Sequence, residues 1–134
     1  MKLTRRYRFS ASHRLDTPAL SADENRKLYG KCNNPYGHGH DYVLDVTVAG
    51  SPDESGQIAS REALDTLVRE RVLDHFDHRN LNTDIPEMVG LVATTESLAV
   101  TIENALAHDW PLPARLDRVR ISETDRNIFE LKTK

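Results

Sequence analysis

Two histidines separated by one glycine, His38 and His40, carry the strongest chemical signal in the sequence. They open a segment, residues 38–49, in which apolar and polar side chains alternate as in a β-strand. Because residues i and i+2 of a strand point to the same face, both imidazoles project side by side, which suits two ligands of one metal ion. The competing interpretation is a polar strand end with solvated histidines.

A third histidine, His13, strengthens the metal interpretation. It directly follows another alternating segment, residues 2–12, at the parity of that segment's apolar side chains. If the two strands pair antiparallel, the end of the first lies beside the start of the second, so His13 comes close to His38 and His40. Three histidines with one open position are typical of a catalytic zinc site, whereas structural zinc sites are closed by four protein ligands.

The single cysteine, Cys32, allows three interpretations. It could be a fourth zinc ligand that closes a structural site. It could be a buried apolar side chain, which is the commonest fate of a free cysteine. It could also be a catalytic thiolate whose pKa is set by a metal ion or a nearby histidine. Spacing alone does not separate these three.

Three further polar residues could take part in chemistry. Asp77 and His78 follow a predicted helix, and such a pair could relay a proton or tune the pKa of a thiol. Their plainer interpretation is a polar loop with a capping aspartate. Glu123 closes a predicted strand, where its carboxylate could accept hydrogen bonds from an amino-heterocycle or could simply be solvated.

The elements that must position these residues follow from the apolar periodicity. In chain order they are strands over residues 2–12 and 38–49, helices over residues 60–75 and from Thr94 or Thr95 to about residue 108, and strands near 116–123 and 127–132. Residues 14–37 and 76–93 are predicted to be mostly loop. The order β-β-α-α-β-β predicts an α+β domain in which two helices cover one face of a four-stranded antiparallel sheet.

The composition restricts the classes of protein to which the chain can belong. Its 134 residues suit one domain, residues 1–134, and its 38% hydrophobic and 29% charged residues are typical of a soluble globular fold. A net charge of −3 gives no general attraction to nucleic acid or to an anionic membrane. One cysteine cannot form an internal disulfide, and no apolar stretch suits a bilayer span or a signal peptide, so we expect a cytoplasmic protein.

Five motifs make the chain resemble the 6-pyruvoyl-tetrahydropterin synthase family, and together they cover nearly the whole chain in family order. They are Phe9-Ser10-Ala11-Ser12-His13-Arg14-Leu15, Tyr29-Gly30-Lys31-Cys32-Asn33-Asn34-Pro35-Tyr36-Gly37-His38-Gly39-His40, Asp77-His78-Arg79-Asn80-Leu81-Asn82, Thr94-Thr95-Glu96 and Ser122-Glu123-Thr124-Asp125. The second motif is highly specific, so a chance match is remote.

The resemblance implies a role for each candidate residue and adds a pterin pocket. The implied zinc ligands are His13, His38 and His40. Cys32 matches the family's catalytic base, and Asp77 and His78 match the pair that works with it. The residues implied to bind the pterin are Thr94, Thr95, Glu96 and Glu123.

The same resemblance implies a fold, a reaction and an assembly. The fold is the tunnelling fold, a four-stranded antiparallel sheet with two helices on one side, which agrees with the order of elements above. The implied enzyme uses Zn²⁺ to convert 7,8-dihydroneopterin triphosphate to 6-pyruvoyl-tetrahydropterin, with elimination of triphosphate. Family members form homohexamers built from two trimers, with active sites at subunit interfaces.

Three rival functions stay open. The 6-carboxytetrahydropterin synthases of queuosine biosynthesis use the same substrate but cleave its side chain, and they usually place a cysteine closer to the histidine pair. Here Cys32 lies six positions before His38, which is the spacing of the pyruvoyl-forming branch. A folate-serving branch has glutamate in place of the cysteine, so Cys32 argues against it. From a different class comes a non-enzymatic module whose structural zinc is held by Cys32 and three histidines.

Overall fold

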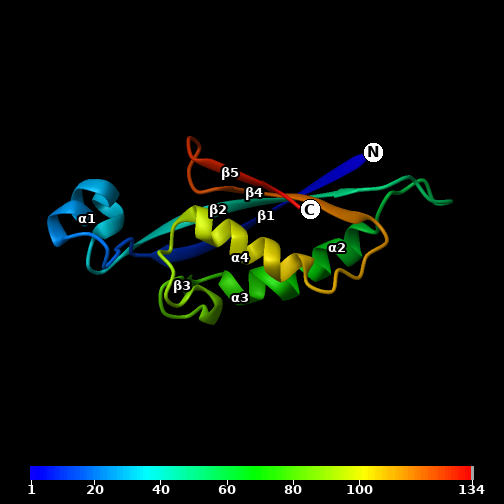
Figure 1. The fold of residues 1–134 in the computed structure, drawn as a ribbon. Coiled ribbons are helices and arrows are strands. Elements are labelled where there is room, and N and C mark those ends of the chain that lie inside the picture. Colours follow the sequence, from blue (N-terminus) through cyan, green and yellow to red (C-terminus); the bar gives the residue numbers. More distant parts are fainter. Residues whose placement is uncertain (134) are drawn as a thin grey trace.

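Two long antiparallel strands form the centre of the protein, of which the computed structural model describes residues 1–133 (Figure 1). Strand β1 (Lys2–His13) pairs along its whole length with β2 (His38–Ala49). Strands β4 (Arg115–Ser122) and β5 (Ile128–Lys132) continue the sheet antiparallel beyond β2. The four strands predicted from the alternation of side chains are therefore confirmed.

Helices cover one face of this sheet (Figure 1). The first predicted helix is a nearly continuous rod made of α2 (Arg61–Val68), a π-helical turn η2 (Arg69–Leu73) and α3 (Asp74–Phe76). The second is α4 (Thr95–Ala107), whose N-cap Thr94 accepts a hydrogen bond from a backbone N–H of the first turn. Among residues 1–133, no helix has the length and the apolar character needed to span a membrane.

The sheet differs from the prediction by one short strand. Strand β3 (Arg79–Asn80) pairs with the end of β1 in the parallel direction, so the sheet is five-stranded and mixed, in the order β3-β1-β2-β4-β5. The prediction of a purely antiparallel, four-stranded sheet was wrong in this detail. A strand of two residues has no alternation to detect, which is why the sequence pattern did not indicate it.

The segment predicted as loop before β2 is also more ordered than expected. It contains helix α1 (Ala22–Tyr29) and a 3₁₀ turn, η1 (Gly30–Asn33), and a further 3₁₀ turn, η3 (Pro86–Met88), lies in the second predicted loop. Helix α1 has little apolar surface, and a capping box begins it. Apolar periodicity carries no information about such hydrogen-bonded caps, so it did not predict this helix.

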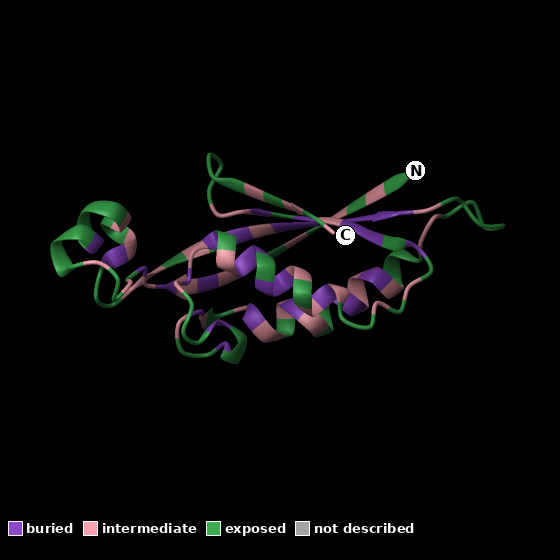
Figure 2. Cartoon of the chain, viewed as in Figure 1, coloured by how far each residue is buried: buried purple, intermediate pink, exposed green. Residues whose placement is uncertain are grey.

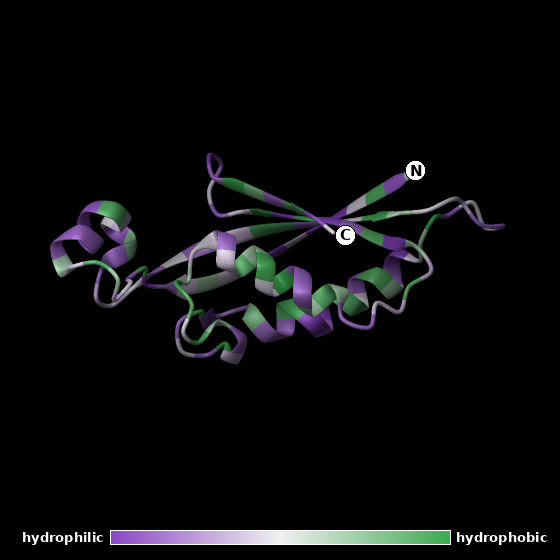
Figure 3. Cartoon of the chain, viewed as in Figure 1, coloured by the Kyte–Doolittle hydropathy of each residue, from purple (hydrophilic) through white to green (hydrophobic). Residues whose placement is uncertain are grey.

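The hydrophobic core lies between the sheet and the helices. Figure 2 shows the buried residues and Figure 3 the hydrophobic residues, and both gather where α4 and the α2–α3 rod face the strands. On this face β2 contributes four fully buried side chains: Tyr42, Leu44, Val46 and Val48. Each buried side chain of this size stabilises the fold by roughly 1.5–3 kcal/mol relative to an exposed one, so this core fixes which face of β1 and β2 the histidines occupy.

A buried carboxylate connects β1 to β4 at the far end of the sheet. Asp117 is the extra residue of a β-bulge in β4, between the residues that pair with Thr47 and Val48, and its side chain is 1% exposed. Three cations lie within ion-pair distance of it, namely Arg118 at 2.9 Å, Arg115 at 3.0 Å and Lys2 at 3.1 Å. Hydrogen bonds from Arg118 and then Lys2 hold the pKa of Asp117 well below its usual range.

The Asp117 cluster predicts a component of acid sensitivity. Because the folded-state pKa is lowered, its contribution to stability is present above the unfolded pKa of about 4 and is lost as pH falls through the folded value. Urea unfolding at a series of pH values below about 5 should give a shallower fall in the free energy of unfolding for Asp117→Asn than for wild type. Asp125→Asn, at the exposed β4–β5 turn, is the control, and equal slopes for wild type and Asp117→Asn would contradict the assignment.

Candidate active site

The pairing register of β1 and β2 brings three histidines together at one end of the sheet. His13 ends β1 opposite His38, and His40 lies opposite Ala11, so all three imidazoles occupy the helix-facing side. Gly37 makes the approach possible, since its φ of 72° is left-handed and a Cβ there would lie 2.8 Å from the His13 carbonyl oxygen. The juxtaposition predicted from the sequence is therefore present in the structure.

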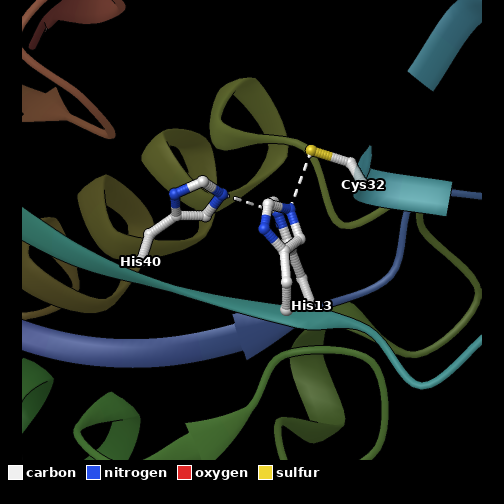
Figure 4. A group of neighbouring side chains, drawn as sticks. His13, Cys32 and His40 are labelled. Carbon is white, nitrogen blue, oxygen red and sulfur yellow. Dashed lines mark hydrogen bonds between the residues drawn. The ribbon is translucent and has the colours of Figure 1, made fainter. Parts of the chain in front are cut away.

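The nitrogen atoms of these histidines converge as metal ligands do. The Nε2 atoms of His13 and His40 are 3.1 Å apart, close to the roughly 3.3 Å between two nitrogens of a tetrahedral zinc site with bonds of 2.0–2.1 Å. One ligand atom from each of His13, His38, His40 and Cys32 lies within 4.8 Å of the other three. Figure 4 shows His13, Cys32 and His40 reaching this point from three segments. The donor set fits one four-coordinate transition metal.

His13 is oriented by a backbone contact. Its side chain is buried, and its Nδ1 lies 2.9 Å from the Ala93 carbonyl oxygen, which can only accept a hydrogen bond. Nδ1 is therefore the protonated nitrogen, and Nε2 keeps its lone pair for a metal. Burial lowers the pKa of both His13 and His40. This favours the neutral imidazole, which is the form that binds metal ions.

Cys32 is fixed beside the histidines by the turn η1. Its carbonyl accepts a hydrogen bond from the Leu15 N–H, and the Asn33 side chain donates to the Leu15 carbonyl, so the turn is tied to the end of β1. The Cys32 sulfur lies 3.0 Å from His38 Nε2. Burial and then the Glu123 carboxylate raise the pKa of the thiol. A cation such as a bound metal would be needed to stabilise the thiolate here.

Glu123 joins the same cluster from the end of β4. One of its carboxylate oxygens lies 2.9 Å from His40 Nε2, and the other accepts a hydrogen bond of 2.7 Å from the Thr95 hydroxyl. Thr95 opens α4 directly after Thr94, which caps the helix. The structure thus gathers Thr95 and Glu123 beside His40 and gives the site one anionic, hydrogen-bond-accepting side, whereas the Thr94 side chain caps α4.

Glu96 is not part of this cluster. It is exposed and lines a groove of about 990 Å³ between α4 and the α2–α3 rod, together with residues such as Arg71 and Val100. Its neighbour Thr95 points to Glu123 instead. Within one chain, the residues at the start of α4 therefore face two different surfaces.

Asp77 and His78 also lie away from Cys32. One Asp77 oxygen accepts a hydrogen bond from the Ser10 N–H and lies 3.0 Å from His78 Nδ1. The His78 side chain is 82% exposed, and its φ of 59° is left-handed. It lines a pocket with Ser10 and Asp41, which lie on the strand face opposite the imidazoles, and His40 also borders this pocket. The pair is intact, but the described residues of one chain do not bring it to the thiol.

One residue of the cluster was not singled out by the sequence analysis. Tyr42 lies two residues after His40 on β2, so it shares the face of the histidines. Burial, and then the charges of Glu123 and Cys32, raise the pKa of its phenol. The strand parity that identified His38 and His40 could have identified Tyr42 as well, but its apolar ring makes it look like an ordinary core residue.

An α+β domain whose central strand pair carries three convergent histidines beside a thiol and a carboxylate has the donor set of a metal-binding domain. The chain belongs to the 6-pyruvoyl tetrahydropterin synthase family, whose sequence model matches residues 2–134.

Individual relatives agree with this membership. The 6-pyruvoyl tetrahydrobiopterin synthase of Poecilia reticulata is 46% identical over 94% of this chain and 86% of its own length. The structure of Caenorhabditis elegans 6-pyruvoyl tetrahydropterin synthase superposes with a TM-score of 0.91 at 38% identity, covering 100% of this chain and 96% of the other. A putative 6-carboxy-5,6,7,8-tetrahydropterin synthase of Archaeoglobus fulgidus is 28% identical over 85% of this chain and 90% of its own length.

The geometry predicts a single metal per chain that depends on the strand histidines. We expect about one bound divalent ion per chain after dialysis against zinc, and a rise in the thermal unfolding midpoint, because a ligand that binds only the folded state stabilises it. The double variant His38→Ala, His40→Ala should show neither effect. His108→Ala, which removes a histidine that is 82% exposed, should behave as wild type. Full metal content in the double variant would disprove the site.

Proposed function

We propose that the protein is a zinc-dependent 6-pyruvoyl-tetrahydropterin synthase, which converts 7,8-dihydroneopterin triphosphate to 6-pyruvoyl-tetrahydropterin and eliminates triphosphate. The observation that carries the proposal is the convergence of His13, His38 and His40 beside Cys32, with the Glu123 carboxylate 2.9 Å from His40. The relatives named for this reaction, with which the chain shares nearly its whole length, support it.

Zinc is the metal that the donor set supports best. Three neutral imidazoles are typical of catalytic zinc sites that keep a fourth position open. His13, His38 and His40 would hold the ion, and the contact of His13 with the Ala93 carbonyl would keep its Nε2 directed at it. When bound, zinc supplies Lewis acidity, which makes the O–H and C–H bonds of the substrate side chain more acidic.

Side chains of the protein itself would have two separate roles, proton transfer and pterin binding. Cys32 Sγ, as thiolate, would take a proton from the substrate side chain and return it at another position, as a general base and acid. Glu123 would anchor the pterin, since a carboxylate only accepts hydrogen bonds and the heterocycle offers an amino group and ring N–H groups. Thr95 holds one Glu123 oxygen in place, and Thr94 and Glu96 are the remaining proposed pterin-binding residues.

Two alternatives share parts of this geometry. The carboxytetrahydropterin synthases of queuosine biosynthesis match the chain at lower identity, which favours the pyruvoyl product. A structural zinc module is compatible with the position of the Cys32 sulfur, which lies within 4.8 Å of the three histidine nitrogens. The expected cytoplasmic location stays a prediction from the sequence.

Incubation of the purified, zinc-loaded protein with 7,8-dihydroneopterin triphosphate tests the proposal. Mass spectrometry should detect 6-pyruvoyl-tetrahydropterin and free triphosphate. Cys32→Ala should lower turnover by roughly 10²–10⁴-fold, the usual contribution of a positioned general acid or base, while zinc content and substrate affinity stay near wild type. Glu123→Ala should instead weaken pterin binding first, because it removes a ground-state anchor.

The other outcomes identify the rivals. A carboxylated pterin with acetaldehyde as products would indicate the queuosine enzyme. Loss of zinc from Cys32→Ala, with no turnover by wild type, would indicate the closed structural site. Unchanged turnover in Cys32→Ala would exclude this residue as the base.

The placement of Asp77 and His78 supports an oligomer with interfacial active sites. Neither residue reaches Cys32 within the described part of one chain, and His78 is exposed where a second copy could receive it. The sheet also has edges to cover, because β3 pairs with β1 only at Ala11 and Ser12. We therefore propose a homohexamer of two trimers, in which Asp77 and His78 of one chain assist Cys32 of another.

Mixing two inactive variants tests this arrangement. Cys32→Ala and His78→Ala should each be inactive alone if each site needs both residues. Coexpressed in one oligomer, they should recover about a quarter of wild-type activity, since each site draws its two residues at random from two chains. The control is the double variant, with Cys32→Ala and His78→Ala in the same chain, coexpressed with Cys32→Ala. It should stay inactive, because neither chain then supplies Cys32. Failure of the first mixture to recover activity, or a monomer by light scattering, would contradict the proposal.

A further inference from the structure

The Tyr42 ring is held rigidly in the site. Its side chain is fully buried on β2, and the ring stacks on Phe9 with centroids 5.2 Å apart and an interplanar angle of 17°. Its edge meets His40 with centroids 5.7 Å apart. The position of the phenol oxygen is therefore determined by packing on β1 and by the proposed metal ligand.

The hydroxyl of Tyr42 is buried and has no hydrogen-bond partner among residues 1–133. A hydroxyl removed from water without a partner destabilises the folded state, and such groups are rare in proteins. Where such an unpaired buried group occurs, one explanation is a ligand that supplies the missing hydrogen-bond partner when it binds. Tyr7, a tyrosine of β1, shows the usual arrangement, because its hydroxyl donates a hydrogen bond to Asp65.

The neighbours of the unpaired hydroxyl identify what would bind there. Val43 and Ser122 form the last pair of the β2–β4 ladder, and Tyr42 and Glu123 each lie one residue beyond that pair. Besides burial, the charges of Glu123 and Cys32 raise the pKa of the phenol and an interaction with the Thr95 side chain lowers it, so these three residues surround the hydroxyl. The two Glu123 oxygens contact His40 and Thr95, and neither contact involves the Tyr42 hydroxyl.

We propose that the Tyr42 hydroxyl is a third anchoring group of the pterin pocket, which donates a hydrogen bond to an acceptor atom of the bound heterocycle. This inference rests on the proposed function. A pterin has an amino group and ring N–H on the same edge as its carbonyl oxygen. Glu123 would accept hydrogen bonds from the amino group and ring N–H, and Tyr42 would donate one to the carbonyl oxygen. Together they would select a heterocycle with both donors and an acceptor on one edge, which Glu123 alone cannot do.

Two matched tyrosine variants test the inference on the zinc-loaded protein. Tyr42→Phe removes a hydroxyl that is unpaired in the free protein, so its thermal unfolding midpoint should be no lower than that of wild type. Its affinity for 7,8-dihydroneopterin, the substrate without its triphosphate, should fall about five- to tenfold, as expected for one lost hydrogen bond. Tyr7→Phe loses the bond to Asp65, so it should be less stable but bind 7,8-dihydroneopterin as wild type does.

Three results separate the inference from the function on which it rests. Equal 7,8-dihydroneopterin affinity in wild type and Tyr42→Phe would overturn the inference and leave the proposed function intact. A drop in the midpoint of Tyr42→Phe as large as that of Tyr7→Phe would also overturn it, since the hydroxyl would then be paired without ligand. A wild-type protein that does not bind 7,8-dihydroneopterin at all would overturn the proposed function itself, and the inference with it.

Discussion

The register between β1 and β2 is the constraint on which the rest of the structure depends. Opposing residues run from Lys2 and Ala49 at one end to His13 and His38 at the other. A slip by one residue would turn every side chain of one strand to the opposite face, because side chains alternate along a strand. The apolar residues that fill the core therefore also decide where the imidazoles point. Metal binding and hydrophobic burial depend on the same alignment, so the core preorganises the site.

Much of this arrangement could be predicted from the sequence because it follows from periodicity. The alternation along residues 38–49 matches β2, and the parity of His13 correctly placed it beside the histidine pair. Helix α1 could not be predicted in the same way, because its stability comes from a capping box and from the buried Asn25 amide, which donates to three backbone carbonyls. The location of Glu96 depends on the rotation of α4 about its own axis, which its apolar stripe defines only loosely.

The site also shows how two faces of one strand pair can serve different purposes. The helix-facing side holds the histidines, Glu123 and Tyr42 in a partly buried cluster, where burial lowers the pKa of His13 and His40 and strengthens hydrogen bonds. The opposite side presents the exposed His78 at the sheet edge. One chain therefore carries the histidine cluster and the Asp77–His78 pair on different surfaces, which sequence analysis of a single chain cannot place relative to one another.

The connection between the two central strands begins and ends at the His13–His38 pair, and this has a consequence for how its length can vary. Because the ends are held together by the ladder, a longer connection costs little, about 0.6 kcal/mol for each doubling of a flexible loop. The stretch before η1, which includes the exposed part of α1, could therefore gain or lose residues while the strand ends stay in place. The stretch from Cys32 to His38 has no such freedom, since any insertion there would move the sulfur away from the imidazoles. Length variation should therefore be concentrated on one side of Cys32.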